Sequence, residues 1–173
     1  MRKSCIAFAA AALALVLAAC AGPDAPATTS PAATPGGTPL SPYPEAYVFQ
    51  VRGTEVAIDQ DMAEVLEALG EANSYFEAAS CAFDGLDKTY TYSGFVITTR
   101  PDGDRDLVNS ILLTDDSVAT AEGIYIGSSQ ADVLAAYGDT EVAYNVIQYT
   151  LDNTTLNFIL EGGTVLSIEY IPA

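Results

Sequence analysis

Side chains able to do chemistry are few in this chain, and their types exclude most reactions. The 173 residues contain no histidine and only three cysteines. Without histidine there is no imidazole base, no Ser-His-Asp triad and no histidine metal ligand. The sequence carries neither a Walker glycine motif nor a dinucleotide-binding one. We therefore predict that the protein is not an enzyme and uses no cofactor.

One acidic triplet has the spacing of half a metal site. Asp102, Asp104 and Asp106 alternate as in the first half of a calcium-binding loop. Such a loop needs glycine at its sixth position and glutamate at its twelfth, where this chain has Leu107 and Leu113. The triplet is therefore only a weak candidate for calcium, and a solvated hairpin tip is the alternative that we favour.

The first residues of the chain have the pattern of a targeting segment. Arg2 and Lys3 form a charged start, and an uninterrupted apolar run follows from Ile6 to Leu17. This run is shorter than the roughly 20 residues that a transmembrane helix needs. The pattern predicts an export signal over residues 1–19.

The end of this segment resembles the lipobox of bacterial lipoproteins, because Leu17-Ala-Ala-Cys20 follows in register. The resemblance implies that the signal is cut before Cys20 and that the thiol of this cysteine carries lipid. More than one acyl chain gives a stable membrane anchor. The protein would then sit on the extracytoplasmic face of a cell membrane, at the cell surface or in the periplasm. The alternative is an ordinary secretory signal cut near Ala19 or Ala21.

A linker, residues 20–44, follows the anchor. It is rich in proline, alanine and threonine and nearly uncharged. Such a segment buries too little apolar surface to fold, and its prolines make it a semi-extended spacer. We therefore expect it to hold the folded part away from the membrane.

The chain is strongly acidic, with a formal net charge of −17. This charge disfavours binding to nucleic acid and disfavours lying on an anionic bilayer. It fits a basic protein partner. General acidity of exported proteins is the alternative explanation.

Cysteine usage leaves one candidate thiol. Cys5 is lost with the signal and Cys20 is consumed by lipid, so Cys81 remains and no internal disulfide is expected. Small and apolar neighbours, among them Ala82 and Phe83, favour a buried cysteine. A reactive thiol, or one paired with another molecule, is the alternative.

One stretch of the chain occurs twice, since Met62–Glu71 recurs as Gln130–Asp139. Each copy has apolar residues at helical spacing, an N-cap before them and a glycine after them. The predicted caps are Asp61 and Gly70 in the first copy, and Ser129 and Gly138 in the second.

Alternating apolar and polar residues around each helix predict β-strands. We divide the folded part into a first repeat, residues 45–119, and a second repeat, residues 120–173. In each, one strand precedes the helix and a three-stranded antiparallel meander follows it. The sequence thus predicts an α+β fold of two tandem β-α-β-β-β repeats, each a helix packed on a meander.

The order of lipobox, linker, capped helix and meander, with the phrases Ile124–Gly138 and Gly162–Ile168, resembles two related groups. One is the outer-membrane assembly lipoproteins of the BamE/SmpA-OmlA type. The other is the β-lactamase inhibitor protein (BLIP), which has tandem repeats. The run Ser80–Lys88 also resembles lipoproteins of Gram-positive bacteria with this build. This chain lacks the paired disulfides of the inhibitor, and no binding residue is carried over from it.

Anchor, spacer, repeat and missing catalytic groups together favour one function. We expect a membrane-anchored lipoprotein that binds a protein partner or serves as an envelope-assembly module. The alternative is a surface lipoprotein that binds a small ligand or calcium.

The two repeats differ in length at one place. Between the helix-ending glycine and the next aligned tyrosine, Tyr90 or Tyr149, the first repeat is longer by about nine residues. The longer segment, Ser74–Lys88, concentrates aromatic side chains, and insertions of this kind often carry function. We predict that a partner binds here and at the neighbouring strand, with core packing as the alternative. The candidate partner-binding residues are Tyr75, Phe76, Phe83, Tyr90 and Tyr92.

Overall fold

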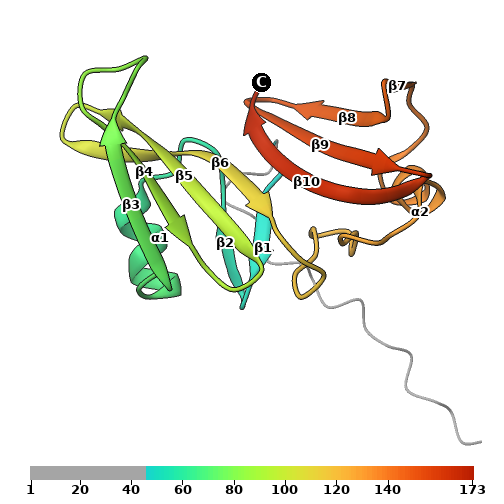
Figure 1. The fold of residues 1–173 in the computed structure, drawn as a ribbon, viewed down its shortest axis with the longest axis horizontal. Coiled ribbons are helices and arrows are strands. Elements are labelled where there is room, and N and C mark those ends of the chain that lie inside the picture. The colour runs from blue at the N-terminus through green and yellow to red at the C-terminus, as the bar shows by residue number, and fades with distance from the viewer. Residues whose placement is uncertain (1–45) are drawn as a thin grey trace, which may run out of the picture. The chain divides into compact units, whose positions relative to one another are not determined.

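The described part of the chain is built mainly of antiparallel strands. A computed structural model describes residues 46–173. The predicted signal, Cys20 and the whole of the linker lie outside the described residues. In chain order the elements are β1 (Phe49–Val51), β2 (Thr54–Val56), α1 (Met62–Leu69), β3 (Ser74–Ala79), β4 (Leu86–Thr91), β5 (Phe95–Asp102), β6 (Arg105–Leu113), α2 (Gln130–Tyr137), β7 (Val142–Ala143), β8 (Val146–Leu151), β9 (Thr154–Glu161) and β10 (Thr164–Pro172) (Figure 1).

Eight strands form one continuous sheet. They hydrogen-bond in the order β3-β4-β5-β6-β10-β9-β8-β7, while β1 and β2 form a separate hairpin (Figure 1). Each half of the chain contributes four consecutive strands. The halves join where Ile111, Leu112 and Leu113 of β6 pair with Tyr170, Glu169 and Ile168 of β10.

The predicted α+β fold of two tandem helix-on-meander repeats is wrong. Strands make up 48% of the described residues and helices only 12%, so the protein is mostly β. The prediction failed because β6 and β10 pair with each other, which satisfies the backbone groups that a separate meander would leave exposed at its edge. Helices of eight residues, or about two turns, also cover only part of the sheet each.

The two helices have the predicted caps. The Asp61 side chain accepts a hydrogen bond from the Ala63 N–H at 2.9 Å. Ser129 forms a capping box with Asp132. Gly70 and Gly138 follow the helices with φ of 79° and 98°, values that favour glycine. Among residues 46–173, neither helix has the length and apolar character needed to cross a bilayer.

Equivalent hydrogen bonds hold each half of the chain together. The Asp59 N–H donates to the Val108 carbonyl at 2.9 Å, and the Gly127 N–H donates to the Val165 carbonyl at 2.8 Å. Asp59 has φ of 67° and Gly127 has φ of 107°, so the same left-handed turn precedes each helix. Each helix is thereby placed in the same way against the last strand of its half.

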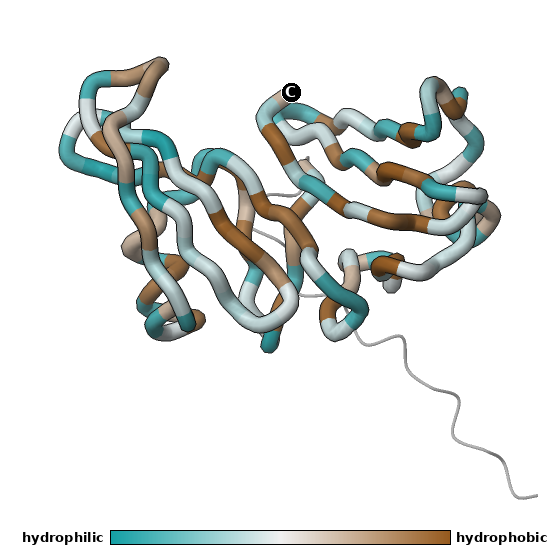
Figure 2. Tube along the Cα trace, in the orientation of Figure 1, coloured by the Kyte–Doolittle hydropathy of each residue, from teal (hydrophilic) through white to brown (hydrophobic). Residues whose placement is uncertain are grey.

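One face of the sheet forms the core. Alternate residues of β5 and β10 are buried, as expected when side chains alternate between two faces. In Figure 2, apolar and polar residues alternate along the strands. The helices and the β1–β2 hairpin supply the other side of the core, where Phe49, Met62 and Val133 are at most 1% exposed. The opposite face of the sheet carries half-buried side chains such as Thr98 and Asn157.

Candidate interaction surface

The structure divides the five predicted binding residues into two groups. Tyr75, Phe76 and Phe83 are 50%, 65% and 47% exposed, whereas Tyr90 and Tyr92 are 8% and 4% exposed. Tyr90 and Tyr92 are buried because their side chains lie on the side of the sheet that faces the core. Only the first three residues are therefore available to a partner.

Tyr92 is a core residue with a structural task. Its ring stacks on Phe95 at 4.9 Å between centroids, and its hydroxyl donates to the Gly70 carbonyl at 3.1 Å. Tyr149 donates in the same way to the Gly138 carbonyl at 2.6 Å. The residue equivalent to Tyr149 is thus Tyr92, so the alignment with Tyr90 that gave an insertion of about nine residues is wrong.

The extra residues form the outer end of the hairpin made by β3 and β4. Phe76 pairs with Thr89, and residues 77–88 lie between them. In the other half, Ala143 pairs with Val146, and only the turn residues 144–145 lie between them. The first hairpin therefore extends well beyond the sheet, whereas its counterpart stops at a tight turn.

Cys81 lies at the end of this hairpin and is exposed, so the prediction that it is buried is wrong. The alanines around it suggested a core position. They are exposed as well, because the hairpin end projects past the elements that cover the core. The turn is closed by the Ser80 N–H, which donates to the Gly85 carbonyl at 3.0 Å.

One ion pair, Lys88–Asp106, and one cation–π contact, Arg100–Phe83, hold the hairpin end against β5 and β6. The guanidinium carbon of Arg100 lies 5.7 Å from the centre of the Phe83 ring, a cation–π distance. Arg100 also bonds Asp59 at 2.7 Å, and Lys88 bonds Asp106 at 2.6 Å. The Phe83 ring is thus supported from one side and open to solvent on the other.

The outermost strand, β3, presents a free edge. Among residues 46–173 it pairs with β4 alone, and all six of its residues are exposed. The opposite edge strand of the sheet, β7, has two residues. A long exposed edge is a template for pairing with another chain, and most proteins protect such edges.

Tyr75 and Glu77 interact along this edge strand. The Tyr75 ring lies 5.1 Å from the Tyr90 ring, and its hydroxyl donates to the Glu77 carboxylate. This hydrogen bond is the main cause that raises the pKa of Tyr75 to about 12. The tyrosine therefore stays neutral at physiological pH, and the carboxylate of Glu77 is fixed beside it.

Two of the three carboxylates of the acidic triplet pair with cationic side chains. Asp102 bonds Arg105 at 2.6 Å, and Asp106 bonds Lys88 at 2.6 Å. Within residues 46–173, the structure has no group of three or more acidic, cysteine or histidine side chains arranged to hold a metal ion. The triplet forms a hairpin end between β5 and β6, with Gly103 at φ of 63°.

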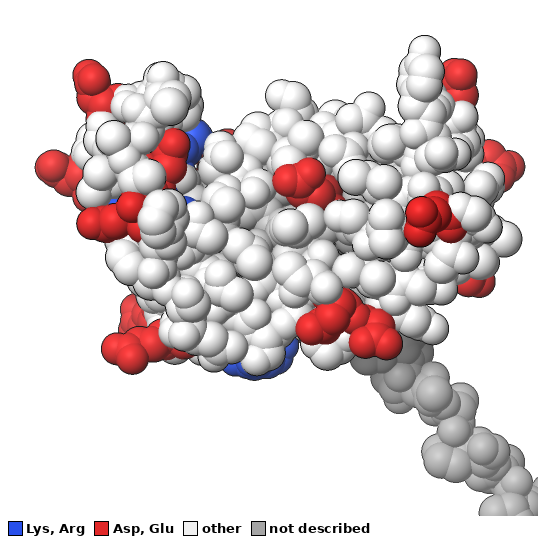
Figure 3. All heavy atoms as spheres, in the orientation of Figure 1, with Lys and Arg blue, Asp and Glu red and all other residues white. Residues whose placement is uncertain are grey.

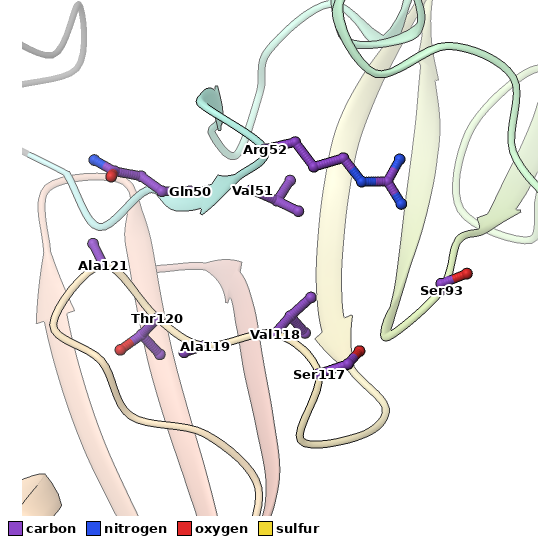
Figure 4. A pocket seen from close by; sticks show the side chains of 9 residues that line it. All are labelled: Gln50, Val51, Arg52, Ser93, Ser117, Val118, Ala119, Thr120 and Ala121. Atoms are coloured by element: carbon purple, nitrogen blue, oxygen red, sulfur yellow. The ribbon is translucent and has the colours of Figure 1, made fainter.

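A hollow of about 480 Å³ lies beside the β1–β2 hairpin (Figure 4). Gln50 donates to Glu55 at 3.3 Å, and the Thr120 hydroxyl accepts from a backbone N–H at 3.2 Å. Figure 4 shows the polar ends of Gln50 and Thr120 on one side and that of Arg52 on the other. The polar ends of these three side chains do not point toward one position in the hollow.

Comparison with protein-family models, with curated proteins and with solved structures found no match to this chain.

Proposed function

We propose that the protein is a membrane-anchored, extracytoplasmic lipoprotein that binds a protein partner through the β3–β4 hairpin and carries out no catalysis. The proposed anchor is lipid on Cys20, from the resemblance of Leu17-Ala-Ala-Cys20 to a lipobox. The linker, residues 20–44, would carry the folded part away from the membrane surface.

The observation that carries this proposal is the exposure of large apolar side chains on one hairpin. Tyr75, Phe76, Phe83 and Leu86 are 50%, 65%, 47% and 39% exposed, and we name them the hairpin surface. Aromatic residues dominate the binding energy of protein interfaces, and clustered exposed apolar groups mark interaction sites. A hairpin that extends beyond the sheet presents these groups without disturbing the core.

The charge distribution supports a protein partner. In Figure 3 most acidic side chains lie around the outline of the molecule, and the area between them is largely uncharged. The uncovered face of the sheet carries short polar groups such as Thr98 and Ser110, whose hydroxyls form a hydrogen bond at 2.8 Å. A partner that reaches from the hairpin onto this face would meet few charges there that binding would have to desolvate.

Partner capture tests the proposal with a matched pair of variants. Phe76→Ala removes the most exposed ring of the hairpin surface. Tyr144→Ala removes a fully exposed ring at the equivalent hairpin of the other half. We expect detergent-solubilised envelope to yield one protein that the wild-type chain and Tyr144→Ala capture and Phe76→Ala does not. All three chains should melt at the same temperature. Equal capture by the two variants would contradict the proposal.

The anchor is tested separately with Cys20→Ser. Without the thiol no lipid can be attached, so the variant should remain uncleaved at this site and should incorporate no labelled fatty acid. Metabolic labelling followed by membrane fractionation measures both. A variant that still incorporates fatty acid would show that Cys20 is not the lipidation site.

A further inference from the structure

At the free edge of β3, the backbone N–H and C=O groups of alternate residues point outward, where another strand can bind them. In an antiparallel pair, alternate residues of a strand bond the neighbouring strand. The Ser80 N–H bonds the Gly85 carbonyl, so Ser80 is a bonded position. Because bonded positions alternate along the strand, Phe76 and Ala78 also bond to β4. The residues between them, Tyr75, Glu77 and Ala79, therefore direct their N–H and C=O groups away from β4.

Two of the usual protections of an edge strand, proline and lysine, are missing from β3. The strand reads Ser-Tyr-Phe-Glu-Ala-Ala and contains neither proline nor lysine. Its pairing with β4 runs without a register shift from Ser74 to Ala79. Prolines, charged side chains and bulges are among the devices that keep edge strands from pairing with other chains. The single charge on β3 is that of Glu77.

That charge selects against a second copy of the same chain. If two copies paired antiparallel with full overlap of Tyr75, Glu77 and Ala79, each Glu77 would lie opposite its counterpart. Like charges directly opposite each other are destabilising, and two chains of net charge −17 repel each other as well. A strand with a lysine or arginine opposite Glu77 instead gains a cross-strand ion pair.

We propose that β3 binds an extended segment of a partner protein by strand addition, with a basic residue of that segment opposite Glu77. Backbone bonds to Tyr75, Glu77 and Ala79 provide the pairing. Phe76 flanks the added strand on the uncovered face of the sheet, and Tyr75 flanks it on the other face. The inference rests on the proposed function and names the chemistry of the partner.

A defined peptide tests the inference. The probe is a short fluorescent peptide of alternating valine and threonine with a central lysine, and its counterpart has a central glutamate. Anisotropy titration of the full chain should show tighter binding of the lysine peptide.

Glu77→Lys should reverse this preference. Ala79→Pro should weaken binding about tenfold, the equivalent of one lost hydrogen bond. Proline at this position removes an outward N–H only.

Amide exchange on the wild-type chain tests the same pairing without any variant. The lysine peptide should slow exchange at Tyr75, Glu77 and Ala79, while Phe76 and Ala78, already bonded to β4, should be protected with and without peptide. No binding of either peptide, or equal binding by Ala79→Pro, would overturn strand addition. A β3-dependent dimer in sedimentation would also overturn it, since the edge would then bind a second copy. Loss of partner capture in Phe76→Ala, with no peptide binding, would leave the proposed function standing and this inference refuted.

Discussion

At the scale of single residues, the tyrosine hydroxyls differ in whether they find a partner. Tyr92 and Tyr149 each donate to the carbonyl of a helix-ending glycine. The Tyr170 hydroxyl is buried and has no hydrogen-bond partner in the described part of the chain. Burial also raises the pKa of Tyr170, so the group stays neutral. An unsatisfied buried hydroxyl destabilises the folded state.

Tyr170→Phe should therefore stabilise the protein. Removing the unpaired hydroxyl should raise the free energy of unfolding by about 1 kcal/mol, whereas Tyr92→Phe should lower it by about 1 kcal/mol because a hydrogen bond is lost. Denaturant unfolding of both variants measures the difference. Equal destabilisation by the two substitutions would mean that the Tyr170 hydroxyl has a partner.

The pair of Tyr75 and Glu77 gives a pH dependence at the candidate site. The folded pKa of Tyr75, about 12, lies above the value of about 10 for an unfolded tyrosine. Its contribution to stability is therefore fully present below pH 10 and is lost as the pH rises through 12. Glu77→Gln should lower the pKa of Tyr75, because the carboxylate that accepts a hydrogen bond from the Tyr75 hydroxyl is gone.

Ultraviolet titration of tyrosinate measures this shift. Tyr75→Phe identifies the step that belongs to Tyr75, since that step disappears in the variant. If this titration step occurred at the same pH in Glu77→Gln, the hydrogen bond between the two side chains would not be the cause of the raised pKa.

At the scale of elements, the helices are held by few residues. Met62 is 1% exposed and belongs to the core, whereas Leu66 packs against it from a half-buried position. Helix α1 has about two turns, so its attachment depends on the few side chains that contact β2 and β6.

Met62→Ala should cost about 2–5 kcal/mol as a truncation of a fully buried side chain. Leu66→Ala should cost clearly less, since part of the leucine surface remains in water in the folded state. Calorimetric melting of the two variants compares them. A larger effect at Leu66 would mean that α1 is rotated relative to the structure.

Local patterns predicted the helices because a cap, an apolar stripe and a terminal glycine all lie within ten residues. Strands β3 and β7 were not predicted. The residues of β3 are all exposed and so lack the alternation of a half-buried strand. Cys81 was placed in the core for a related reason, since apolar neighbours do not show that the surrounding hairpin projects into solvent. Of the candidate site, Tyr75, Phe76 and Phe83 were predicted at a surface that the structure exposes, and Tyr90 and Tyr92 were not separable from them by residue type.

At the scale of the whole molecule, the two halves share one core. The Phe49 ring of β1 lies 5.0 Å from Phe95 of β5 and 6.0 Å from Tyr170 of β10. Pairing of β6 with β10 adds backbone bonds between the halves. No local sequence pattern predicts the pairing of β6 with β10, because these strands are far apart in the sequence.

Unfolding should therefore be a single cooperative transition. Ile97→Ala in β5 and Ile147→Ala in β8 truncate side chains that are 0% exposed in different halves. Both should shift the same midpoint by an amount that corresponds to about 2–5 kcal/mol. Far-ultraviolet and near-ultraviolet circular dichroism should give coincident curves. Two separate transitions, each moved by one variant only, would show that the halves fold independently.

The most direct test of the hairpin surface as a docking site is photo-crosslinking in intact cells. A photoreactive amino acid replaces Phe76 in one chain and Tyr144 in another, and both chains keep Cys20. Illumination should join position 76, and not position 144, to one partner protein, which mass spectrometry can identify together with the contacted segment. That segment should be extended in the partner and contain a basic residue. Crosslinking at position 144 alone, or at neither position, would contradict docking at the β3–β4 hairpin.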